Sequence, residues 1–145
     1  MDMNSNQGYY IEDLALGMVA EFERTVTGGD IDQFADVSGD TNPIHLDEDY
    51  AANTMFKTRI AHGMLTASFI STVLGTRLPG PGCIYLSQSL RFKAPVKPGD
   101  KVLARATVSG MNTDRRRVTM TCECVVGDTV VLDGEAELIV PTRAA

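Results

Sequence analysis

The chain has 145 residues, of which 43% are hydrophobic, and this suits one domain with a proper core. Its 19 acidic and 13 basic residues give a net charge of -6, which disfavours nucleic acid and anionic membrane surfaces as partners. The three cysteines form neither a disulfide framework nor a zinc pattern.

The N-terminal region shows no targeting signal. Residues 1–9 are rich in Asn, Gln and Ser, and we expect them to form a flexible tail before a single domain over residues 10–145. The start carries acidic residues rather than a basic segment, and the apolar stretch from Ile11 to Ala20 is too short and interrupted for a signal or membrane span. We therefore expect a cytoplasmic protein without a membrane partner.

The first elements are a strand and a short helix. Residues 20–27 predict the strand, which a pair of glycines would end. Asp30 followed by Gln33 resembles a capping box, and the apolar spacing after it predicts a helix as far as Ser38. Gly39 can end this helix in a left-handed conformation.

Asp40 and His45 lie on either side of an Asn-Pro turn. Pro43 fixes its own φ and moves Asn42 out of the helical region, so Asp40 and His45 can converge across the turn. A carboxylate and a neutral imidazole that converge can hold a water and take its proton, as a general base does. The alternative is that Asp40 only braces the turn and His45 is a half-buried structural histidine. Asn42 would brace the turn or orient the water.

The longest apolar helix follows a brief one. Asp47 predicts an N-cap for a helix over residues 48–52, and residues 53–61 read as a loop. The segment from Met64 to Leu74 has apolar and small residues nearly all the way round. Such a helix is buried, and this one is too short to span a bilayer, so we expect it at the centre of the core.

Gly63 lies at the N-terminus of this helix. Unpaired backbone N–H groups and the helix dipole there favour developing negative charge, and a residue without a Cβ lets a ligand carbonyl come close. The alternative is that Gly63 only makes a tight turn into the helix. We expect His62 to be a structural loop histidine rather than a catalyst.

The second half of the chain predicts a sheet. Four strands are expected, over residues 83–94, 101–111, 117–126 and 129–140. Gly127-Asp128 is a two-residue hairpin signal between the last two. Cys122 and Cys124 alternate with polar residues and should point into the core. With the first strand this gives an α+β domain, an antiparallel β-sheet wrapped around a long central helix.

Several motifs carry a family resemblance. They are Asp40-Thr-Asn-Pro-Ile-His45, Ala61-His-Gly-Met64, Tyr85-Leu-Ser-Gln-Ser-Leu-Arg-Phe92, Pro95-Val96 and Gly99-Asp100. In order and spacing they resemble the R-specific enoyl-CoA hydratases of the MaoC-like, hotdog-fold superfamily. The resemblance extends from about Ala20 to Pro141, and its Asp-x-Asn-Pro-x-His element is the specific part.

The resemblance implies a hotdog fold, a homodimer and a reaction. The reaction is reversible syn addition of water to a trans-2-enoyl-CoA, which gives the (R)-3-hydroxyacyl-CoA. Asp40 and His45 would activate the water, and the Gly63 N–H would bind the thioester oxygen as it takes on enolate character. Neither a metal nor a redox cofactor is implied, and coenzyme A enters as part of the acyl-CoA substrate.

Other roles and functions stay open. Ser71 either faces the site or packs, and Leu74 would help to floor the acyl pocket. Arg115-Arg116-Arg117 would meet the coenzyme A phosphates or form a solvated hairpin tip. The alternative functions are a 3-hydroxyacyl-[acyl-carrier-protein] dehydratase, a non-catalytic acyl-CoA binding module and, from the fold alone, a thioesterase.

Overall fold

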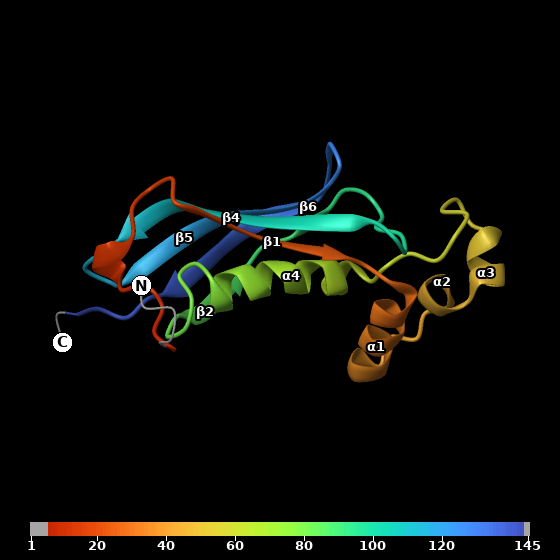
Figure 1. The fold of residues 1–145 in the computed structure, drawn as a ribbon, viewed down its shortest axis with the longest axis horizontal. Coiled ribbons are helices and arrows are strands. Elements are labelled where there is room, and N and C mark those ends of the chain that lie inside the picture. The colour runs from red at the N-terminus through yellow and green to blue at the C-terminus, as the bar shows by residue number, and fades with distance from the viewer. Residues whose placement is uncertain (1–5, 144–145) are drawn as a thin grey trace.

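The structure is a computed structural model that describes residues 6–143. Within this range six strands form one antiparallel sheet in the order β1-β4-β5-β6-β2, and the short β3 also pairs with β6. The strands are β1 Val19–Thr25, β2 Ile84–Gln88, β3 Arg91–Phe92, β4 Lys101–Asn112, β5 Arg117–Val126 and β6 Thr129–Ile139. Helix α4, Gly63–Thr76, runs along one face of this sheet (Figure 1). The predicted α+β architecture is confirmed.

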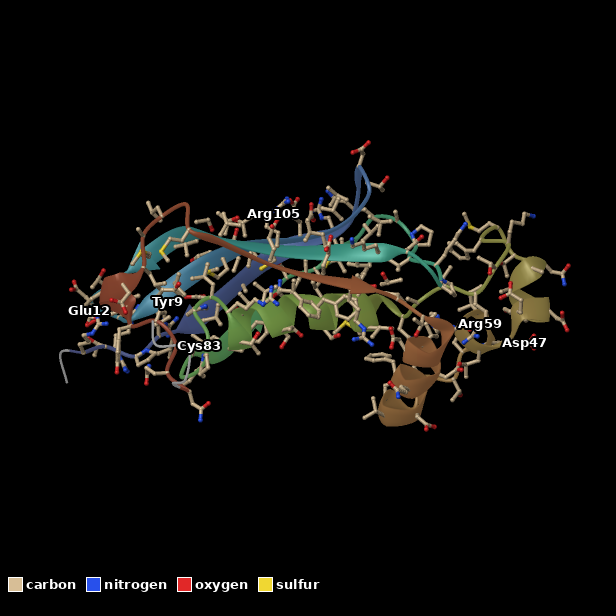
Figure 2. The ribbon with its side chains drawn as sticks, in the orientation of Figure 1. Tyr9, Glu12, Asp47, Arg59, Cys83 and Arg105 are labelled. Carbon is tan, nitrogen blue, oxygen red and sulfur yellow. The ribbon has the colours of Figure 1, made fainter. Side chains whose placement is uncertain are left out.

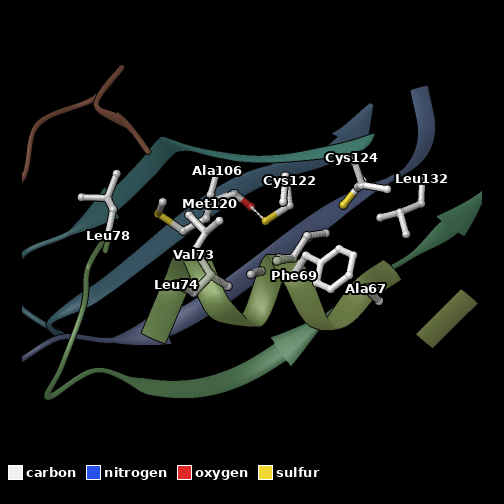
Figure 3. Close-up of a cluster of buried hydrophobic side chains, with 14 of the residues drawn as sticks. Ala67, Phe69, Val73, Leu74, Leu78, Ala106, Met120, Cys122, Cys124 and Leu132 are labelled. Carbon is white, nitrogen blue, oxygen red and sulfur yellow. Dashed lines mark hydrogen bonds between the residues drawn. The ribbon is translucent and has the colours of Figure 1, made fainter. Parts of the chain in front are cut away.

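The core lies between α4 and the sheet. Figure 3 shows Phe69, Val73 and Leu74 of the helix facing Met120 and Cys122 of the sheet. Burial raises the pKa of the Cys122 thiol to about 11, as expected for a core residue rather than a reactive one. The prediction that Cys122 and Cys124 point into the core is confirmed, since both are fully buried.

The far side of α4 is open in the single chain. Met64 is 57% exposed, and Ser68 and Ser71 are also exposed. The expectation of a helix buried all round is therefore wrong for this chain alone. The residues on that side are small or apolar, so the sequence showed no charged face there, although no element within residues 6–143 covers them.

Edge strands β2 and β3 replace the single strand predicted over residues 83–94. The regular ladder with β6 is interrupted at Ser89. There the Ser89 N–H donates to the carbonyl of Glu135, and the Ser89 hydroxyl, in place of its carbonyl, accepts from the Glu135 N–H. Gly134 allows the approach, because a Cβ there would lie 1.8 Å from the Ser89 carbonyl oxygen. By contrast, β5 covers the predicted residues 117–126, where apolar and polar residues alternate.

Three short helices lie together beyond one end of the sheet (Figure 1). They are α1 Gly28–Ser38, α2 Pro43–Leu46 and α3 Glu48–Ala52. The capping box of α1 is one turn earlier than predicted: Thr27 is the N-cap and Asp30 the third residue, so the two glycines begin the helix instead of ending the strand. Gly39 ends α1 with φ 78°, as predicted. Asp47 caps α3, also as predicted.

The N-terminal segment is fixed where it is described. The N–H groups of Gly8 and Tyr9 donate to the carbonyls of Pro81 and Pro79, and the short 3-10 helix η1, Ile11–Asp13, follows. Gly8 and Tyr9 of the predicted tail are therefore anchored to the loop after α4, and residues 1–5 lie outside the described range. Figure 2 shows Tyr9 and Glu12 at the end of the molecule opposite Arg59. Among the described residues, no helix combines the length and the apolar character needed to cross a bilayer.

Candidate active site

Asp40 follows the end of α1 and leads into α2. Its N–H donates to the Ser38 hydroxyl at 3.1 Å, and its carboxylate accepts from the Asn42 N–H at 3.3 Å. The Asn42 side chain accepts from the Ile44 N–H at 3.1 Å and so caps α2, with Pro43 as the first helical residue. The structure therefore favours bracing over water orientation as the role of Asn42, and it leaves the Asp40 carboxylate exposed at the turn.

His45 lies in α2 and is only 9% exposed. Its Nδ1 lies 2.7 Å from the carbonyl oxygen of Ile60. A carbonyl can only accept, so a neutral His45 carries its proton on Nδ1 and keeps Nε2 as a lone-pair acceptor. The backbone carbonyl of His45 in turn accepts from Nε of Arg59 at 2.5 Å, and Arg59 also pairs with Asp32 of α1 at 2.6 Å. Arg59 and Ile60, in the segment before α4, thus hold both the ring and the main chain of His45.

The turn brings Asp40 and His45 together. A carboxylate oxygen of Asp40 and a ring nitrogen of His45 lie within 4.8 Å of each other. One water that makes two hydrogen bonds of ordinary length spans about 4.5 Å between its two partners. The two groups are therefore close enough for a single water to bridge them.

A pocket of about 610 Å³ opens beside this pair. It lies within the size range of small-molecule sites, and apolar side chains form most of its wall. Its lining residues include Phe34, Asp40, His45, Phe56, His62, Gly63, Met64, Thr66, Phe92, Val131 and Leu132. A few polar groups on an apolar wall suit a ligand with an apolar chain and one reactive polar centre.

Gly63 is the first residue of α4, where its N–H has no acceptor within the helix. The ring of Phe92 lies against its Cα: a Cβ on Gly63 would be 2.6 Å from Cε1 of that ring. Glycine lets the Phe92 ring pack this closely against the start of α4, and a larger residue would push the ring aside.

His62 completes a cluster of three groups that are potential metal ligands. The rings of His45 and His62 are stacked, with centroids 3.9 Å apart and planes at 26°. In-plane lone pairs of two stacked rings run side by side instead of converging on one ion. One nitrogen of each ring also lies at hydrogen-bond distance from a backbone carbonyl. This arrangement suits a water better than a metal ion.

The single chain does not bring the other predicted residues to this pocket. Ser71 is exposed on the open side of α4, and Leu74 is buried in the core at the opposite half of that helix. Arg115 to Arg117 lie at the β4–β5 hairpin, at the far end of the sheet from α2 (Figure 1), and Arg117 pairs with Glu137.

Three residues that directly contact the proposed catalytic groups are absent from the sequence-based prediction of site residues. Arg59 and Ile60 lie in a stretch that reads only as loop, and their roles arise from a hydrogen bond to the main chain and from a backbone carbonyl. Phe92 reads as a strand residue. The sequence indicated the importance of Gly63, but it did not indicate that Phe92 packs against it.

The antiparallel sheet folded about one long helix places the chain in the hotdog-fold class, and an acid–histidine turn lies beside the N-terminus of that helix. The chain matches the MaoC like domain family over residues 14–129 and belongs to that family. It is 55% identical to the (R)-specific enoyl-CoA hydratase of Rhodospirillum rubrum, over 93% of this chain and 94% of that protein. It is 52% identical to the 3-hydroxybutyryl-CoA dehydratase of Methylorubrum extorquens, over 92% of this chain and 85% of that protein. Among solved structures, R-hydratase PhaJ1 from Pseudomonas aeruginosa matches with a TM-score of 0.90 and 44% identity, over 94% of this chain and 88% of that one.

Proposed function

We propose that this protein is an R-specific enoyl-CoA hydratase, which adds water reversibly to a trans-2-enoyl-CoA and forms the (R)-3-hydroxyacyl-CoA. The observation that carries the proposal is the water-sized separation between Asp40 and His45 beside the N-terminus of α4. Relatives at 55% and 52% identity are named for this reaction or for its reverse on coenzyme A thioesters.

The pair supplies the water. Nε2 of His45 accepts one hydrogen bond because Nδ1–H is directed to Ile60, and the Asp40 carboxylate accepts another. The Asp40–His45 pair takes a proton from the water as the water oxygen bonds to C3 of the substrate. The electrons of the C2–C3 double bond move towards the thioester oxygen, and the pair then returns a proton to C2 as the carbonyl re-forms. Because both groups lie on one side of the pocket, hydrogen and hydroxyl add to the same face.

Gly63 stabilises the charge that forms. The enolate oxygen of the thioester accepts from the Gly63 N–H, where the dipole of the 14-residue helix adds a positive field. One such donor is worth roughly 3 kcal/mol in the transition state. The proposed reaction uses no cofactor beyond the coenzyme A of the substrate.

The proposal includes a homodimer in the cytoplasm. Apolar side chains are exposed along the edge strands, including Ile84 at 57% and Phe92 at 56%, next to the open side of α4, and a second copy would cover them. The three cysteines are all free thiols, as is usual in a reducing compartment. Light scattering after gel filtration tests the dimer.

The reaction is tested with purified protein and crotonyl-CoA. Loss of the enoyl-thioester absorbance measures hydration, and coupling to an R- or S-specific dehydrogenase identifies the product. We expect the R product, and we expect Asp40→Asn to lower turnover by roughly 100-fold or more. Asp36→Asn, an exposed carboxylate on α1, is the matched control and should leave turnover unchanged.

Three results would contradict the proposal. Formation of the S product would exclude the R-specific reaction. Absence of turnover on crotonyl-CoA and on longer enoyl-CoA substrates, with activity on the acyl-carrier-protein thioester, would move the assignment to the dehydratase of carrier-bound substrates. Binding of acyl-CoA without turnover on either carrier would indicate the binding module.

A further inference from the structure

His62 makes more contacts with the candidate site than a loop histidine requires. It directly precedes α4 and is 2% exposed. Its ring stacks on the ring of His45. It also packs against the ring of Phe34, with the two centroids 4.8 Å apart and the ring planes at 56°. Its Nε2 lies 2.9 Å from the backbone carbonyl oxygen of Asp40. One side chain thus touches both members of the proposed catalytic pair.

The hydrogen bond sets the ring's protonation pattern. The Asp40 carbonyl can only accept, so Nε2 of His62 carries the hydrogen, and a neutral ring keeps a lone pair on Nδ1. That Nδ1 is buried and has no hydrogen-bond partner among the described residues. A buried polar atom without a partner lowers stability, so the fold alone does not explain a histidine here.

A phenyl ring would fill the same space without that cost. What a phenyl ring lacks is the N–H that holds the Asp40 carbonyl. This bond connects the turn that carries Asp40 to the residue directly before Gly63, while the stacking contact fixes the plane of His45. His62 therefore lies at the point where the carboxylate, the imidazole and the helix N-terminus meet.

We propose that His62 is a positioning residue, whose Nε2–H holds Asp40 in register with His45 and with the N-terminus of α4. The inference rests on the proposed hydratase function. His62 need not touch the substrate or exchange a proton. It acts by keeping the water site and the oxyanion donor at a fixed separation, to which reaction rates are sensitive.

The test compares two substitutions. His62→Phe keeps the ring and loses the donor, and we expect a folded protein with a melting temperature close to that of the wild type. Its kcat on crotonyl-CoA should fall roughly 10- to 100-fold with little change in KM, because misplaced groups slow the chemical step. His62→Gln keeps an N–H at a similar reach and should recover part of the lost kcat.

Val118→Ala is the control for stability loss alone. Val118 is fully buried in β5, near the end of the sheet opposite α2, and its truncation should lower the melting temperature and leave kcat unchanged. If His62→Phe behaves like Val118→Ala, losing stability but not kcat, the residue is structural and the proposal is wrong. The proposal is also wrong if His62→Gln is no more active than His62→Phe.

A readout without turnover separates this inference from the hydratase assignment. In carbon-detected NMR, loss of the hydrogen bond in His62→Phe should shift the Asp40 carbonyl resonance and increase backbone motion over residues 40–42. Unchanged signals there would overturn the inference even in an active enzyme. If the wild type does not hydrate enoyl-CoA but the signals change as expected, the assignment of function fails and the positioning role stands.

Discussion

The carbonyl oxygen of Ile60 lies 2.7 Å from Nδ1 of His45, and this contact determines which nitrogen of the imidazole faces the pocket as an acceptor. The general-base geometry thus depends on a main-chain atom in a segment that reads as loop in the sequence.

Asp40→Asn and His45→Gln should each lower kcat by roughly 100- to 10,000-fold, the range typical of a lost general acid or base. Asp40 is exposed, so Asp40→Asn should leave the melting temperature almost unchanged. Steady-state kinetics with crotonyl-CoA and thermal unfolding measure both effects. A lower melting temperature with unchanged turnover would show that the residue only braces the turn.

Arg59→Met should lower the free energy of unfolding by about 2 kcal/mol, because it leaves the half-buried His45 carbonyl without its charged donor. The ion pair with Asp32 contributes less, since the Asp32 side chain is 63% exposed. Asp32→Asn should therefore cost less than about 1 kcal/mol. Denaturant unfolding of both variants gives the comparison, and equal losses would mean that the ion pair, and not the carbonyl contact, is what matters.

Gly63→Ala should reduce kcat/KM through Phe92. The new Cβ would lie 2.6 Å from the ring, which is partly exposed and can move aside, so the protein should still fold. In a double-mutant cycle with Phe92→Ala, we expect a coupling of about 0.5–3 kcal/mol in the activation free energy.

Gly75→Ala is the matched control in the same helix, because nothing lies within 4 Å of its Cβ position. It should be neutral for activity and add up to about 1 kcal/mol of stability. Additive effects of Gly63→Ala and Phe92→Ala would contradict the packing explanation.

Asp30 should contribute to the loss of unfolding free energy at acid pH. The hydrogen bond from Arg24, at 2.6 Å, is the main cause that holds the pKa of Asp30 below its usual value of 3.8. A lowered pKa in the folded state means that the carboxylate stabilises the fold above 3.8 and loses this effect as pH falls through the folded-state pKa. The difference in unfolding free energy between wild type and Asp30→Asn should therefore be largest near neutral pH and shrink in acid. A difference that is constant with pH would exclude this linkage.

The native thiols should react slowly with a thiol reagent at neutral pH. Burial raises the pKa of Cys124 to about 12 and also raises that of the half-buried Cys83. All three cysteines should react at once when the protein is unfolded in denaturant. Rapid modification of Cys124 in the native state would show that the core between α4 and β5 opens readily.

Local patterns in the sequence predicted most of the fold. The alternation of apolar and polar residues over 117–126 predicted β5. Asp47 predicted the N-cap of α3, and Gly39 ends α1 as expected. One error arose where two signals competed. Thr27 and Asp30 both have capping side chains, and the box belongs to the earlier one.

The site was predictable only where its groups are close in sequence. Asp40 and His45 follow from the turn chemistry around Pro43, and Gly63 follows from the start of a helix. The bond from His62 to the Asp40 carbonyl joins residues 22 positions apart and requires the fold. The same holds for the contact of Phe92 with Gly63, which needs the paired edge of the sheet.

The pocket described above is built from three separate stretches of chain. The proposed reactive groups fall within residues 40–63, whereas part of the facing wall comes from residues 94–96 and 131–132. The hydrogen bonds that fix His45 all lie within the first stretch. Selectivity for the acyl group can therefore be redesigned apart from turnover: a library of substitutions confined to Ala94, Val96, Val131 and Leu132 would vary what fits while the reaction machinery stays as it is.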